Sequence, residues 1–246
     1  MKKFELTDEF ITILGRKLFR IKALVDFSNV KAGELGGYVE KENNLSNEGD
    51  AWISGNARVH GNAWVHGDAQ VFDNALVSGN AQISGNARVH GDAHVFGNAL
   101  VSGNARVHGN AWVHGDAWVH GDAQVFDNAQ ISGNARVHGN AWVYGNVQVY
   151  GNAQISGNAQ ISGNAQISGN ARVHGNADYT TIKGFGTCFR NTTFFKCKNN
   201  TVEVSCGCFL GTIDEFREQV KKTRRGKIAE EYLRIADLME FHFNNK

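Results

Sequence analysis

The phrase Ala-Trp-Ile-Ser-Gly-Asn at residues 51–56 opens a six-residue pattern that continues without insertion to residue 177. Counting in sixes from Ile53 to Val173 gives 21 positions, and every one holds Val or Ile. Ala stands two residues before each of them, with the single exception of Val147, and Gly or Asp followed by Asn or Asp comes after. A short, fixed period of this kind predicts a solenoid and outweighs local propensity.

Side chains in a strand alternate between its two sides, so the Ala and the Val or Ile of each phrase point to one side together. The other two positions vary freely, as in Arg58 and His60 or Trp64 and His66. Gly-Asn and Gly-Asp tolerate positive φ and therefore predict corners. Each buried Val or Ile contributes roughly 1.5–3 kcal/mol before chain entropy is subtracted. The pattern predicts short strands, tight corners and a stiff body with an aliphatic interior.

The phrase Val59-His60-Gly61-Asn62-Ala63-Trp64 resembles the hexapeptide repeat of left-handed parallel β-helix proteins. The resemblance implies an all-β solenoid with three hexads in each coil, and therefore about seven regular coils over residues 51–184. A prism of that size would be roughly 34 Å long at the spacing of stacked strands. The left-handed turn is implied by the resemblance alone, and the residues also allow a right-handed solenoid.

Residues 1–50 predict a small N-terminal β cap. Apolar runs on either side of Gly15-Arg16 indicate an antiparallel hairpin. Val39 and Leu45 are six residues apart, and the longer step to Ile53 indicates an imperfect first coil. A cap is needed because a bare solenoid end exposes apolar side chains and open strand edges.

Residues 185–246 predict a C-terminal module of two strands and two helices, a ββαα unit. The strands are expected at 193–198 and 201–206. Thr212 and Glu215 form a capping-box pattern that starts the first helix. The second helix is expected over about 227–241 from its apolar spacing. The module either caps the solenoid or forms a separate binding unit.

Phrases near both ends resemble hexapeptide-repeat proteins found mostly in phage and prophage genomes, which are often labelled polymer-forming cytoskeletal proteins. They are Leu35-Gly36-Gly37-Tyr38-Val39, Glu42-Asn43-Asn44-Leu45-Ser46, Cys206-Gly207-Cys208-Phe209 and the run from Gly211 to Phe216. The resemblance implies a viral protein acting in the host cytoplasm. It brings no activity with it.

Charge argues against two classes of partner. The chain has a formal net charge of +1, and the repeat, counted over residues 51–178, holds five Arg, seven Asp and no Lys. Because nucleic-acid binding needs clustered basic residues, a nucleic-acid partner is not expected. The start of the chain has no apolar signal core, and no run is long enough to span a membrane. We therefore expect a cytoplasmic protein with reduced thiols at Cys188, Cys197, Cys206 and Cys208.

The same pattern argues against catalysis. Many left-handed β-helix proteins are acyltransferases, and their catalytic His comes with a loop that leaves the coil. Here no insertion interrupts the six-residue spacing, so no such loop is expected. Nine of the ten His take outward positions, and eight of these nine occupy the slot that also holds Ser, Phe and Tyr. At 18 residues per coil, His90 would stack on His108 and His120 on His138, without further ligands to complete a metal site. We expect no catalytic residue, no cofactor and no metal; zinc at the Cys residues stays open.

Two groups of residues are candidates for contact with a partner. Folding at 18 residues per coil places an aromatic group on one face, which favours lateral packing. These residues are Trp52, Phe72, Phe126, Trp142 and Tyr144. The second group is a basic cluster between the two helices, consisting of Lys221, Lys222, Arg224, Arg225 and Lys227.

The sequence favours a non-enzymatic, rigid scaffold or protein-interaction protein that associates with itself as a dimer or trimer. The first alternative is a phage inhibitor that binds a host defence protein through its end modules. The second is a hexapeptide-type acyltransferase. The copies of Ala-Arg-Val-His-Gly, which begin at residues 57, 87, 105, 135 and 171, fall on different faces of a three-sided coil. This placement suits a spacer or a multivalent surface better than one catalytic cleft.

Overall fold

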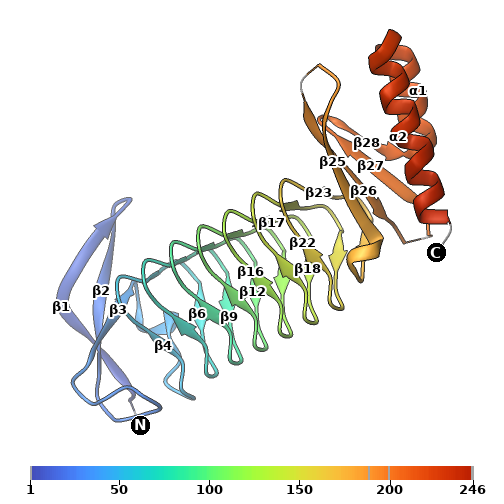
Figure 1. Cartoon of the computed structure of the whole chain (residues 1–246). Coiled ribbons are helices and arrows are strands. Elements are labelled where there is room, and N and C mark those ends of the chain that lie inside the picture. Colours follow the sequence, from blue (N-terminus) through green and yellow to red (C-terminus); the bar gives the residue numbers. More distant parts are fainter. Residues whose placement is uncertain (1, 188, 199, 245–246) are drawn as a thin grey trace.

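A computed structural model describes residues 2–187, 189–198 and 200–244. It confirms the predicted fold class: an elongated parallel β-solenoid with an antiparallel hairpin at one end and a sheet with two helices at the other (Figure 1). In the described residues the repeat forms 21 strands of two residues each, arranged on three faces. The handedness of the coil stays a prediction.

Each face is a parallel sheet in which every strand pairs with the strand 18 residues away. The first face consists of β5 (Arg58–Val59), β8 (Leu76–Val77), β11 (His94–Val95), β14 (Trp112–Val113), β17 (Gln130–Ile131), β20 (Gln148–Val149) and β23 (Gln166–Ile167). The second face consists of β6 (Trp64–Val65), β9 (Gln82–Ile83), β12 (Leu100–Val101), β15 (Trp118–Val119), β18 (Arg136–Val137), β21 (Gln154–Ile155) and β24 (Arg172–Val173). The third face consists of β4 (Trp52–Ile53), β7 (Gln70–Val71), β10 (Arg88–Val89), β13 (Arg106–Val107), β16 (Gln124–Val125), β19 (Trp142–Val143) and β22 (Gln160–Ile161).

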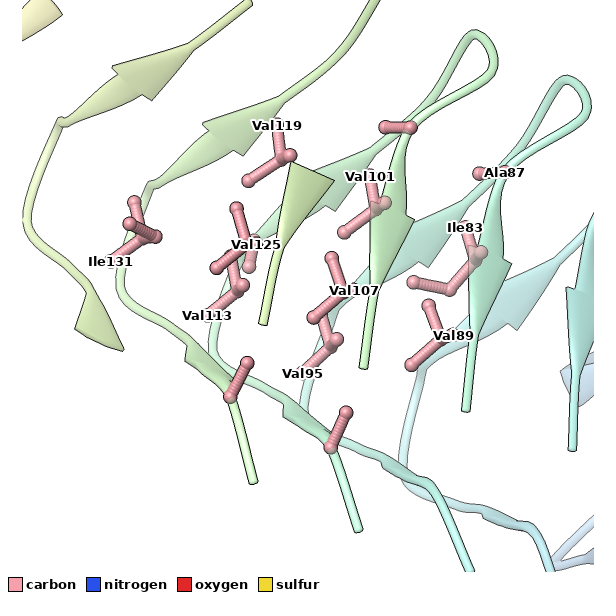
Figure 2. Packing of buried hydrophobic residues seen from close by; sticks show 14 of the residues in the cluster. Ile83, Ala87, Val89, Val95, Val101, Val107, Val113, Val119, Val125 and Ile131 are labelled. Carbon is pink, nitrogen blue, oxygen red and sulfur yellow. The ribbon is translucent and has the colours of Figure 1, made fainter. Parts of the chain in front are cut away.

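The interior of the solenoid is aliphatic and dry. Each inward Val or Ile of the repeat is fully buried, and so is Val147 in its Ala position. Figure 2 shows side chains from the three faces, such as Val107, Val113 and Val119, converging on this interior. Backbone hydrogen bonds join the coils, for example from His108 N to Val125 O at 3.0 Å. The expected division into inward and outward positions is therefore confirmed.

The corners explain why the repeat needs Gly. Gly103 has φ +67°, and a Cβ there would lie 2.9 Å from the backbone N of Gly121 in the next coil. Two corners carry Asp instead, with φ 59° at Asp73 and 58° at Asp127. Each of these carboxylates accepts the N–H of the Gly one coil further on, at 3.1 Å. The Asp side chain thus offsets backbone strain through a hydrogen bond that an aliphatic side chain cannot make.

Amide side chains form rows along the corners. The Nδ2 of Asn80 donates to Asn98 Oδ1 at 2.9 Å, and Asn98 donates in turn to Asp116 Oδ1 at 2.8 Å. Asp116 has no N–H to pass on, so the row cannot continue from it to Asn134. Each Asp in such a row therefore ends a run of hydrogen bonds between coils.

The N-terminal cap contains the predicted hairpin. Strands β1 (Phe4–Ile13) and β2 (Arg16–Ala23) pair antiparallel around Leu14 and Gly15, which both have positive φ. Strand β3 (Leu35–Val39) pairs with β2 on one side and with β5 on the other, so the hairpin extends the first face. The expected imperfect coil follows: after the short 3-10 helix η1 (Glu42–Asn44), Leu45 forms a bridge with Val65.

The C-terminal module contains more strands than the sequence predicted. Its antiparallel sheet has four, namely β25 (Tyr179–Phe185), β26 (Arg190–Lys196), β27 (Val202–Cys206) and β28 (Phe209–Thr212). The first of them follows the 3-10 helix η2 (Asn176–Asp178) and takes in residues that the sequence assigned to the end of the repeat. Once the Gly corners are lost, the chain pairs antiparallel with β26 instead of coiling, with Tyr179 opposite Phe195.

Two helices follow the sheet, α1 (Ile213–Thr223) and α2 (Gly226–Asn244). The capping box is confirmed, because Thr212 Oγ1 accepts from Glu215 N at 3.2 Å and Glu215 accepts from Thr212 N at 2.8 Å. Leu238 follows the apolar spacing from which the second helix was expected, but it is 57% exposed. Cys188 and Asn199 lie outside the described residues.

Strand β26 joins the module to the solenoid. Its neighbouring residues Phe194 and Phe195 are both fully buried, but in different cores. Phe195 belongs to the solenoid interior, whereas Phe194 packs with the helices. Successive side chains of a strand point to opposite sides, so this one sheet both covers the end of the prism and carries the helices.

Candidate interaction surfaces

The third face carries the aromatic group expected from the sequence. The register confirms the 18-residue coil, since Trp142 pairs with Gln124 on one side and Gln160 on the other. Each strand of this face presents an outward side chain, and the residue after its Val or Ile presents a second. The outward surface is therefore two parallel columns of side chains along the prism.

Five rings in one column form a continuous stack, which we call the aromatic ladder. Its members are Phe72, His90, His108, Phe126 and Tyr144. Neighbouring ring centroids are 4.5, 4.9, 5.0 and 5.0 Å apart, with interplanar angles of 5°, 10°, 3° and 1°. Stacked pairs of aromatic rings contribute about 0.5–1.5 kcal/mol beyond the area they bury. The ladder therefore ties successive coils together, and its ring faces are covered by their neighbours.

The two Trp residues proposed for this surface differ sharply. Trp142 is 41% exposed and meets Phe126 edge to face, with centroids 6.2 Å apart. Trp52 is only 5% exposed, because the N-terminal cap covers it and Phe27 packs against it at 5.4 Å. The expectation that Trp52 lies on the outer surface is therefore wrong: it secures the cap to the first coil.

Charge at the centre of the third face comes from Arg88 and Arg106. They are exposed, lie on adjacent strands, and no described carboxylate lies within 4 Å of either guanidinium. Burial lowers the pKa of His90, against the opposing effect of Asp73, whose Oδ2 lies 3.6 Å from His90 Nδ1. Burial and the charge of His90 lower the pKa of His108. Near neutral pH the ladder is therefore uncharged beside two positive guanidinium groups.

Aromatic contacts also occur on the other faces. On the first face, Trp112 stacks on His94 at 5.2 Å, and Phe96 stacks on His114 at 4.8 Å. On the second face, Arg136 lies over the ring of Trp118 at 4.9 Å. Trp112 and Trp118 are 43% and 42% exposed, much like Trp142. Exposure alone does not single out the third face; the length of its ring stack does.

The His pairs expected from the 18-residue coil form as stacked rings. His90 and His108 stack at 4.9 Å, and His120 and His138 at 5.0 Å. Within the described residues, no group of three or more His, Cys, Asp or Glu side chains is placed to hold a metal ion. No described helix combines the length and apolar character that crossing a bilayer requires.

The basic cluster between the helices is only partly available to a partner. Lys221 pairs with Glu218 at 2.9 Å, and Lys227 lies 3.8 Å from Glu231. Arg225 donates to the carbonyls of Lys221 and Arg224 at the end of α1, at 2.6 and 2.7 Å.

No described carboxylate lies within 4 Å of Lys222, Arg224 or Arg225. Because the Arg225 guanidinium is engaged by the backbone carbonyls at the end of α1, Lys222 and Arg224 remain. Both are exposed. The charge that could meet a partner is therefore concentrated on these two side chains.

Comparison with known proteins supports the repeat architecture. Segments of the chain match a family model described as the YdcK beta-solenoid repeat, at residues 51–67, 69–81, 81–96, 93–109, 99–115, 129–145 and 165–177. These segments lie inside the solenoid and cover less than half of the chain. No curated protein matched the chain. The chain is a β-solenoid repeat protein.

Proposed function

We propose that the protein is a non-enzymatic, rigid scaffold that associates with a second copy of itself side by side, through the third face. The observation that carries this proposal is the aromatic ladder with the half-exposed Trp142 beside it. Exposed aromatic groups that cluster are typical of contact surfaces, and Trp is the residue most enriched among strong contact residues.

The ends of the prism support lateral rather than end-to-end association. The hairpin and the loop bearing Phe27 cover one end, and β26 covers the other. Lys3 completes the first end, because its Nζ donates to the carbonyls of Gly49 and Ala51 at 3.0 and 2.8 Å. With its terminal coils covered, the solenoid offers a second copy its long faces.

The distribution of hollows favours binding over catalysis in the body. One of about 230 Å³ lies at the seam between the cap and the third face, beside Trp52 and Phe72. Others lie in the C-terminal module. Catalysis needs a pocket that excludes water around a base with a partner. The unbroken run of hexads, by contrast, suits a surface that holds other molecules at fixed spacing.

Sedimentation velocity at micromolar concentration tests the proposal. We expect the chain to sediment as a dimer or trimer, and the double variant Trp142→Ala, Tyr144→Ala to associate at least tenfold more weakly. The matched control is Trp118→Ala, which removes an equally exposed Trp from the second face. A stable monomer for the unaltered chain, or equal weakening by the control, would overturn the proposal.

A host protein is the second candidate partner, reached through the end modules in a phage-encoded inhibitor. The exposed, unpaired charges of Lys222 and Arg224 favour it. A pull-down from bacterial lysate should then recover a partner with the full chain and lose it when both residues become Ala. An acyltransferase, the third class, must bind acyl-CoA, and calorimetry with acetyl-CoA tests this directly.

A further inference from the structure

A cavity of about 180 Å³ opens in the C-terminal module, where the sheet meets the helices. Its wall draws on residues far apart in the chain: Arg190 at the start of β26, Cys208 and Phe209 at the β27–β28 turn, and Arg224 at the end of α1. The turn requires Gly207 because its φ is +64°, and a Cβ there would also displace the end of the Arg190 side chain.

The floor of the cavity is aromatic. Phe216 of α1 is 3% exposed and lies between Phe209 and Tyr232, with ring centroids 5.5 and 5.8 Å away. Val220, one turn further along α1, extends the same apolar wall. A flat apolar group could lie against this wall without uncovering a polar atom.

The two arginines at the cavity, Arg190 and Arg224, differ from Arg217 and Arg234 of the helices. Arg217 contacts Asp214, Asp237 and Glu240 at 2.9, 2.8 and 2.5 Å, and Arg234 pairs with Glu230 at 2.5 Å.

Arg190 and Arg224 both line the cavity, and no described carboxylate lies within 4 Å of either guanidinium. Lys222 and Arg225, which neighbour Arg224 in the chain, add further positive charge to this region. Clustered charge of one sign in a recess raises the local concentration of the opposite ion.

We propose that this cavity binds a small organic anion: an oxyanion group, carboxylate or phosphate monoester, on a planar apolar body. Guanidinium groups match the geometry of both oxyanions through paired N–H donors. The aromatic floor accepts the ring, and the two arginines hold the anion at the mouth. The thiol of Cys208 lies in the same wall and is exposed, so a bound ligand shields it.

Isothermal titration with phenyl phosphate, benzoate, inorganic phosphate and benzylamine tests the site on the full chain. We expect saturable binding of phenyl phosphate or benzoate, at least tenfold weaker binding of inorganic phosphate, and none of benzylamine. Arg190→Gln and Arg224→Gln should each weaken binding of the aromatic anion at least tenfold. Arg234→Gln is the matched control, because it removes an arginine whose charge is already paired, and it should leave binding unchanged.

Alkylation of Cys208 by iodoacetamide, followed by mass spectrometry of its peptide, gives a second readout. Phenyl phosphate should slow the reaction at least threefold in the unaltered chain and in Arg234→Gln, but not in Arg224→Gln. Arg224 lies exposed at a helix end, so its variant folds even if Arg190→Gln does not. Absence of both saturable heat and protection in the unaltered chain overturns the proposal. Equal binding of inorganic phosphate and phenyl phosphate also overturns it, because the aromatic floor would then play no part.

Discussion

The solenoid and the C-terminal module build their cores in opposite ways. Each coil of the solenoid buries the same small set of Ala, Val and Ile, and contacts only the coils beside it. The module packs large side chains such as Phe194, Phe216 and Tyr232 from six elements, and its packing leaves a cavity between sheet and helix. Repetition gives flat, stiff surfaces, whereas irregular packing gives a recess. A scaffold surface and a ligand site can therefore occupy separate parts of one short chain.

A buried charge should have the largest effect of the changes considered, and it should affect the solenoid and the C-terminal module separately. Val107→Asp places an unpaired carboxylate in the dry interior and should cost about 3–5 kcal/mol in the free energy of unfolding. Val220→Asp should instead unfold the module and leave the strand signal of the body intact. Urea unfolding with hydrogen exchange distinguishes the two.

Arg106, the outward neighbour of Val107, provides the control for the unfolding experiment. Arg106→Asp lies on the same strand as Val107 and should change the free energy of unfolding by about 0.5 kcal/mol or less. Equal losses for Val107→Asp and Arg106→Asp would contradict the division into inward and outward positions.

The corners give the next largest effect. Gly103→Ala should cost about 1–2 kcal/mol, because a Cβ must adopt the left-handed region against the next coil. Gly103→Asp should cost about 1 kcal/mol less, since its carboxylate can accept the N–H of Gly121, as Asp73 does from Gly91. Urea midpoints of the two variants test this order, and an Asp variant no more stable than the Ala variant would refute the role assigned to Asp73.

Acid should affect the body before the module. Burial lowers the pKa of the stacked His120 and His138, so the folded chain favours neutral imidazole and the unfolded chain takes up protons first. The stability from these groups is present above about pH 6.5 and is lost as the pH falls below it, before most carboxylates titrate. The melting temperature of the body should therefore fall between pH 7 and pH 5.

Replacing His120 and His138 tests whether these two residues cause the fall in melting temperature. The double variant His120→Ser, His138→Ser should make that fall smaller. Ser is a suitable replacement because the same column already holds it at Ser84 and Ser102. The module contains one His, His242, so its transition serves as an internal reference in calorimetry over the same pH range. An unchanged slope in the Ser variant would assign the effect to other groups.

The smallest expected effect concerns the amide rows. Asp116→Asn restores a donor toward Asn134 and should raise the free energy of unfolding by about 0.5 kcal/mol. Asp8→Asn, on the hairpin and outside these rows, is the control for the loss of one charge. A gain of equal size in both variants would mean that charge, and not the hydrogen bond, is responsible.

The sequence predicted the parts of the molecule that the period controls. The inward aliphatic residues, the three faces and the stacking of His90 on His108 follow from a spacing of six and its multiple of 18. The capping box at Thr212 was readable because its partners are three residues apart. In each case the interacting residues lie at a fixed distance along the chain.

The misjudged parts depend on contacts that no spacing encodes. Trp52 follows the repeat, yet an irregular loop bearing Phe27 covers it. Strand β25 has no period and is defined by its pairing with β26. The cavity brings Arg190 and Arg224 together through the fold of the whole module, so neither residue could be assigned to it from sequence. The ladder could have been found in full by treating His as a ring along with Phe and Tyr.

The three-sided coil has a consequence for how such a chain can vary. Each added hexad advances the chain by one face, so it rotates the C-terminal module by about a third of a turn relative to the hairpin and lengthens the prism by about 1.6 Å. Adding three hexads restores the original orientation at a greater distance. Gain or loss of a single hexad therefore changes the angle between the C-terminal module and the hairpin, while the interior of the solenoid stays the same.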